Sequence, residues 1–155
     1  MDRLQRIMLA NGLLVVLVAM IAGFMLMFSL LGGFEIWPGT TLHFAVYGTS
    51  EGWVRAHSGG TMNGLLVIVI ALALPKMALS ERLQRLMAWG FIYVAWSFTL
   101  FYWFGNAAGN RALSIGDNAL GKSDLFGVIG FLPGLPSVII VIVLLVIAAR
   151  AVMKK

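Results

Sequence analysis

Three polar side chains that could do chemistry lie within otherwise apolar stretches of the chain. His57 and Asn63 flank a glycine-containing segment, and Tyr102 lies in a later, aromatic one. Neutral imidazole is the commonest metal ligand, whereas an amide or a phenol can donate hydrogen bonds to an oxygen that gains negative charge. Polar groups are costly inside a membrane span, so these three residues are the first candidates for function.

The spacing of His57 and Asn63 restricts how they can serve one site. Six residues correspond to about 600° of rotation, so the two side chains do not share a face of one helix. A common site then requires that the helix begins after His57, or that the site lies between subunits. Structural roles stay open: His57 could bond to a loop carbonyl, and Asn63 could bridge two helices.

Glycines and aromatic residues surround these polar groups. Gly59 and Gly60 would allow another helix or a flat cofactor to approach closely. The segment 89–104 holds nine of the 18 aromatic residues, which predicts either a wall for a flat apolar ligand or dense helix packing. Tyr102, Asn106 and Asn110 recur every four residues, and an Asn-Arg pair completed by Arg111 could hold an anionic group.

Only two histidines are available as iron ligands. A haem with two histidine ligands in one chain would need both His43 and His57, whereas a haem with one histidine ligand keeps its sixth position open. Cysteine is absent, so disulfides, thiolate metal sites and cysteine nucleophiles are excluded.

Composition decides the environment of these residues. The chain has 155 residues, 61% of them apolar, with only 11 basic and 6 acidic ones. A soluble domain carries about 25% charged residues. The composition therefore excludes a soluble cytosolic enzyme, a disordered chain and a basic nucleic-acid binder.

Charges divide the chain into four apolar windows, each long enough for the about 20 residues that a spanning helix needs. We therefore predict an all-α, integral-membrane four-helix bundle that forms one transmembrane domain over residues 1–155. The expected spans are 7–32, 57–79, 86–107 and 125–149.

The distribution of Lys and Arg predicts the orientation. Eight basic residues lie on the side of the termini and the 80–85 turn, and three lie on the side of the 33–56 and 108–123 loops. The positive-inside rule then places both termini in the cytoplasm.

Several motifs together resemble the styrene oxide isomerase family of bacteria. The resemblance covers about residues 31–125, and the first and last helices match mainly in hydropathy. It rests on the motifs Gly32–Ile36 with Pro38-Gly39, Glu51–Trp53, Arg55–Gly59, Asn63-Gly64, Phe101-Tyr102 with Phe104, Asn106, and Asn110-Arg111.

The resemblance implies a multi-pass enzyme of the cytoplasmic (inner) membrane that works as a homotrimer with haem b between subunits. His57 would ligate the iron, with Arg55, Gly60 and Arg111 as further cofactor contacts. Asn63 and Tyr102 would orient the oxygen of an aryl epoxide.

The implied reaction is a Meinwald rearrangement of the epoxide to an aldehyde, with ferric haem as Lewis acid. The main alternative is a membrane haem protein for electron transfer that uses His43 and His57. A second alternative is a structural or chaperone-like subunit of a larger membrane complex.

Overall fold

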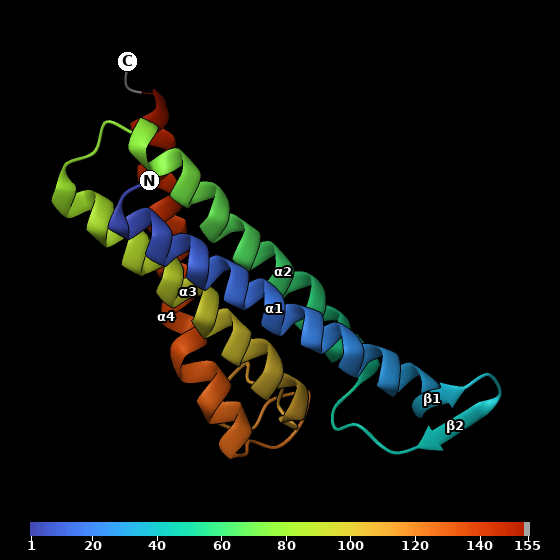
Figure 1. Cartoon of the computed structure of the whole chain (residues 1–155). Coiled ribbons are helices and arrows are strands. Elements are labelled where there is room, and N and C mark those ends of the chain that lie inside the picture. Colours follow the sequence, from blue (N-terminus) through green and yellow to red (C-terminus); the bar gives the residue numbers. More distant parts are fainter. Residues whose placement is uncertain (154–155) are drawn as a thin grey trace.

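Four long helices make up most of the chain in the computed structural model, which describes residues 1–153 (Figure 1). They are α1 (Arg3–Leu31), α2 (Ser50–Ala73), α3 (Glu81–Ala107) and α4 (Leu125–Met153), with a short 3-10 turn η1 (Leu74–Lys76) after α2. Each of the four is long and apolar enough to cross a membrane. The expected all-α architecture with four spanning helices is confirmed, and the chain is an integral membrane protein.

The ends of the helices divide into two groups. The start of α1, the α2–α3 connection and the end of α4 lie together, whereas the 33–49 segment and the α3–α4 loop lie at the opposite end (Figure 1). The charge distribution predicted this separation. That the first end is cytoplasmic remains a prediction of the positive-inside rule.

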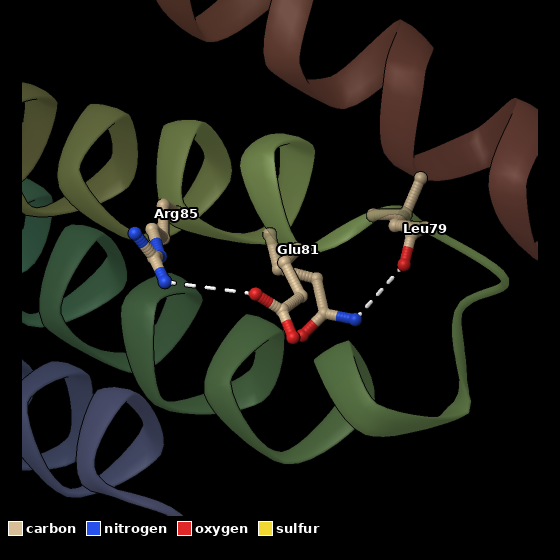
Figure 2. A network of polar contacts seen from close by, with 4 residues as sticks. Leu79, Glu81 and Arg85 are labelled. Carbon is tan, nitrogen blue, oxygen red and sulfur yellow. Dashed lines mark hydrogen bonds and ion pairs between the residues drawn. The ribbon is translucent and has the colours of Figure 1, made fainter.

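The α2–α3 connection is a short, polar turn. The Gln84 side-chain amide donates to the Leu79 carbonyl at 3.0 Å, and Arg85 lies 3.6 Å from Glu81 one helical turn earlier (Figure 2). Both members of the ion pair are largely exposed. The pair therefore contributes little to stability, and the hydrogen bond shapes the turn.

Small residues bring α1 and α2 into close contact. A Cβ added at Gly12 would lie 2.9 Å from the Gly64 carbonyl oxygen, and one added at Gly60 would lie 2.9 Å from the Ala19 Cβ. In lipid, helices associate through such van der Waals packing, because exchanging a contact with lipid for a contact with another helix brings no hydrophobic gain. The α1–α2 pair and the α3–α4 pair diverge toward the loop end of the molecule (Figure 1).

A β-hairpin lies in the loop that the sequence placed at 33–56. Strands β1 (Gly33–Trp37) and β2 (Thr40–His43) pair antiparallel. On α1, Phe28 packs edge-on against both Phe34 and Phe44, with ring centroids 5.7 and 5.4 Å apart. The sequence does not predict these strands, because they are only five and four residues long.

Helix α2 begins at Ser50, well before the expected start at residue 57. The Thr49 hydroxyl accepts a hydrogen bond from the Gly52 amide at 3.1 Å, which is a standard N-cap. The first turns of α2 include Glu51 and Arg55, so hydropathy alone missed them. His57 consequently lies two turns inside the helix.

Candidate functional site

His57 is a half-buried side chain of α2 that faces α1. Its Nδ1 lies 2.9 Å from the Ala19 carbonyl oxygen. A carbonyl oxygen can only accept, so Nδ1 is the donor in this contact, and in the neutral ring Nε2 then keeps its lone pair. The partner is a helix carbonyl rather than the loop carbonyl considered above, and within residues 1–153 no hydrogen bond occupies Nε2 of His57.

Tyr102 lies on the other side of α2, against Gly59. A Cβ added at Gly59 would come within 2.7 Å of the phenol ring and 2.9 Å of its hydroxyl oxygen. The ring also stacks on Phe98, with centroids 6.3 Å apart, and meets Phe101 edge-on at 5.6 Å. No residue in the described part of the chain forms a hydrogen bond with the Tyr102 hydroxyl.

Asn63 belongs to the same face of α2 as Gly59, because residues four apart in a helix are neighbours. Its Nδ2 is buried and has no hydrogen-bond partner within residues 1–153. A buried donor without a partner costs about 1–3 kcal/mol. Within residues 1–153, the α2–α3 side of the molecule therefore presents Asn63 Nδ2 and the Tyr102 hydroxyl as donors without a partner, and Asn106 Nδ2 at the end of α3 is a third.

His57 and Asn63 lie on different faces of one continuous helix. Since α2 begins at Ser50, the option that the helix starts after His57 is eliminated. Gly60 also faces α1, where it contacts Ala19. Close helix packing accounts for Gly60 without the cofactor contact that was expected of it.

A cavity of about 460 Å³ opens between the start of α2 and the end of α3. Its apolar lining includes Phe101 and Leu120, and its polar lining includes Tyr102, Arg55 and Arg111. Arg55 Nε donates to the Glu51 carbonyl at 3.3 Å. Arg111 has a left-handed backbone conformation, with φ of 56°. The two expected arginines thus share a cavity with Tyr102.

Asn106 fixes the shape of this cavity. Its Oδ1 accepts a hydrogen bond from the Thr49 amide at 2.9 Å, and Gly48 and Gly52 leave room for its side chain. The start of α2 is therefore clamped to the end of α3. The sequence places Asn106 in a polar stripe but does not reveal this contact, for which the two glycines are the available signal.

The predicted pair of Asn110 with Arg111 does not form an anion site. Asn110 is fully buried and donates to the carbonyls of Ser114 and Gly116 at 2.8 and 3.0 Å. Its Oδ1 accepts from the Ala112 amide at 3.1 Å. These bonds occupy the side-chain amide of Asn110, which forms the core of the α3–α4 loop. The expected role of Asn110 in holding an anion is therefore wrong.

The aromatic residues of α3 do not form one wall. Trp89 and Tyr93 are 56% and 43% exposed. Trp103 instead packs edge-on against Trp53, whose indole N–H donates to the Tyr47 carbonyl at 3.0 Å. Partial burial raises the pKa of the Tyr47 phenol. Within 89–104, Phe101 and Tyr102 line the cavity, and Phe98 stacks on Tyr102.

Comparison with known proteins identifies the family. A family model described as styrene oxide isomerase matches residues 4–153. A curated styrene-oxide isomerase of Pseudomonas fluorescens is 38% identical over 129 residues, covering 83% of this chain and 76% of that protein. The chain belongs to the styrene oxide isomerase family. The recognised family and the enzyme class, an isomerase, are both confirmed.

The second histidine of this family member lies away from the first. His43 is exposed at the end of β2, and its Nδ1 is 3.4 Å from the Gly32 carbonyl oxygen. His57 contacts α1 at Gly23. These two points of α1 are about 13 Å apart at 1.5 Å per residue, so the two imidazoles of one copy do not share an iron.

Proposed function

We propose that this chain isomerises aryl epoxides of the styrene oxide type to aldehydes of the phenylacetaldehyde type, in the bacterial cytoplasmic membrane. The observation that carries the proposal is the pair of unused donors, Asn63 Nδ2 and the Tyr102 hydroxyl, on one apolar α2–α3 face. Membership of the family supports the same substrate class. An apolar epoxide also partitions into the bilayer, where this face lies.

We further propose haem b as the cofactor, with His57 Nε2 as the iron ligand. The residues fit the group: Nδ1 is held by the Ala19 carbonyl, and Nε2 is free. A single histidine ligand is one of the arrangements that proteins use for haem. When bound, ferric haem supplies a Lewis acid for the epoxide oxygen.

The protein's own residues then have defined tasks. Tyr102 and Asn63 donate hydrogen bonds to the epoxide oxygen and stabilise the negative charge that grows on it as the benzylic C–O bond breaks. A hydride moves from the adjacent CH₂ carbon to the benzylic carbon, which gives the aldehyde with no net oxidation. Phe98 and Phe101 help to exclude water, which would trap the benzylic cation as a diol.

Arg55 and Arg111 are suited to the carboxylates of the cofactor. Both line the cavity that contains Tyr102. Guanidinium groups bind carboxylates through paired, charge-assisted hydrogen bonds. We propose that they hold the haem propionates.

The positions of the donors and the ligand favour a site between subunits. His57 faces α1, whereas Asn63 and Tyr102 lie on the α3 side of the same helix. A substrate bound next to the His57 side of α2 can reach an Asn63 and a Tyr102 only if these two residues come from a different copy. We therefore propose a homotrimer in which His57 of one copy faces Asn63 and Tyr102 of the next.

Absorption and product formation measured on the same sample test the proposed function. We expect the purified protein to show a haem Soret band and to convert styrene oxide to phenylacetaldehyde without any added electron donor. Conversion by fully folded, haem-free protein would refute the cofactor. A haem-loaded protein that leaves styrene oxide unchanged would refute the substrate class.

A matched pair of variants separates the two histidines. His57→Ala should lose both the Soret band and activity, whereas His43→Ala should keep both. Loss of the Soret band in both variants would favour the electron-transfer alternative, with iron held by His43 and His57 of different copies.

A further inference from the structure

Helix α1 forms a seat for the imidazole of His57. The Ala19 carbonyl lies 2.9 Å from Nδ1. Gly23 follows one helical turn later on the same face of α1. A Cβ added at Gly23 would lie 2.9 Å from Nδ1 and 3.1 Å from Cε1 of the ring. The imidazole therefore occupies the space that a side chain at position 23 would need.

The contact of Gly23 with His57 is the last of three contacts between α1 and α2 that involve a glycine. Gly12 faces Gly64, and Ala19 faces Gly60. At the next turn, Gly23 faces His57 instead of another small residue. Helix packing explains the first two pairs, but the third pair places a polar ring where packing alone would accept any small side chain.

We propose that Ala19 and Gly23 are positioning residues that fix both the tautomer and the orientation of His57. The Ala19 carbonyl also accepts the helical hydrogen bond of the Gly23 amide, and its second lone pair takes the Nδ1 hydrogen. Gly23 sets how close the ring comes to that carbonyl. The free Nε2 is thereby held on the part of the ring that points away from this carbonyl.

The hydrogen bond also affects the ligand electronically. A histidine that donates its second ring N–H to an oxygen is a more basic ligand. An uncharged backbone carbonyl supports the imidazole less strongly than a carboxylate would. This inference rests on the proposed function where it concerns iron, but the tautomer and the seat are properties of the chain alone.

The first test therefore uses protein without any cofactor. The chain has only two histidines. ¹⁵N-histidine labelling of the solubilised full chain gives two imidazoles, and His43→Gln identifies which is which. We expect neutral His57 as the Nδ1–H tautomer. An Nε2–H tautomer, or a mixture of the two, would overturn the proposal even if the protein proves to be an active haem enzyme.

The second test compares two glycines of the same helix contact. Gly23→Ala should weaken haem binding roughly tenfold to a hundredfold, as loss of a ligand's supporting contact does. It should also shift the iron–histidine stretching band in resonance Raman spectra. Gly12→Ala is the control, because its Cβ would meet Ile68 and Gly64 at 2.7 and 2.9 Å, far from His57.

The outcomes separate this inference from the proposed function. Equal effects of the two variants on haem affinity, or no effect of Gly23→Ala, would overturn the positioning role. If Gly23→Ala does not fold, the tautomer measurement decides. If wild-type protein binds no haem, the cofactor proposal fails, whereas the tautomer measurement still decides the role of α1.

Discussion

The phenol ring of Tyr102 lies directly against Gly59, with no space between them for a methyl group. This contact joins α2 to α3 one helical turn from Asn63, so that Asn63 and Tyr102 lie on the same side of α2. Because Asn63 is one turn along α2 from Gly59, the glycine determines how near the Tyr102 hydroxyl comes to Asn63.

Gly59→Ala should therefore lower isomerase activity by displacing Tyr102. The added Cβ would lie 2.7–2.9 Å from the ring and hydroxyl, so the ring must move by several tenths of an ångström. Misplacement by about 1 Å can cost about 100-fold in rate. Initial rates of phenylacetaldehyde formation provide the measurement. Gly90→Ala is the control, because its Cβ would meet Leu144 of α4 at 2.7 Å and not Tyr102. Equal loss in both variants would contradict the assignment.

Tyr102→Phe should leave the fold and cofactor content unchanged but reduce turnover. It removes one donor to an oxygen that gains charge, which typically costs about 100-fold or more in kcat. The ring's contacts with Phe98 and Phe101 should persist, so thermal stability should remain near that of the wild type. Unchanged turnover would exclude the hydroxyl from the reaction.

Mixed oligomers can test whether the site is shared between copies. His57→Ala and Tyr102→Phe should each be poorly active alone. Co-expressed, they should recover activity, because some interfaces then combine an intact His57 with an intact Tyr102. The control is the His57→Ala/Tyr102→Phe double variant co-expressed with His57→Ala, which contains no intact His57. A failure of the first pair to recover, with mixed oligomers verified by two affinity tags, would place the site within one copy.

Substitutions of Arg111 should affect thermal stability and haem binding in opposite directions. Its φ of 56° is unfavourable for a residue with a Cβ, by about 1–2 kcal/mol. Arg111→Gly should therefore raise thermal stability while weakening haem binding. Arg111→Lys should retain the charge and the strain, with a smaller loss of affinity. Thermal unfolding and haem titration of the two variants check the prediction, and unchanged haem affinity in Arg111→Gly would remove this residue from the propionate site.

The number and type of the spanning helices could be predicted from sequence because apolar length alone determines them. The start of α2 could not, since Glu51 and Arg55 lie in helical turns that are stabilised by the Thr49 cap rather than by hydropathy. The β1–β2 hairpin also escaped prediction, because its packing depends on Phe28 of a different element.

The candidate residues of the site were visible as polar exceptions, but their partners were not. Sequence identified Gly60 as a place of close approach, whereas only the three-dimensional arrangement reveals that Ala19 is what approaches. Asn106 and Asn110 look equivalent in sequence. One clamps the cavity and the other builds a loop, because their surroundings come from residues distant along the chain.

The α1–α2 contact also has a consequence for biosynthesis. The atoms that hold the His57 ring belong to α1, and the ring itself belongs to α2. Chains are made from the N-terminus, and early segments can fold while later ones are still being synthesised. The oriented histidine, together with Asn63 on the same helix, can therefore be in place before α3 packs Tyr102 against α2.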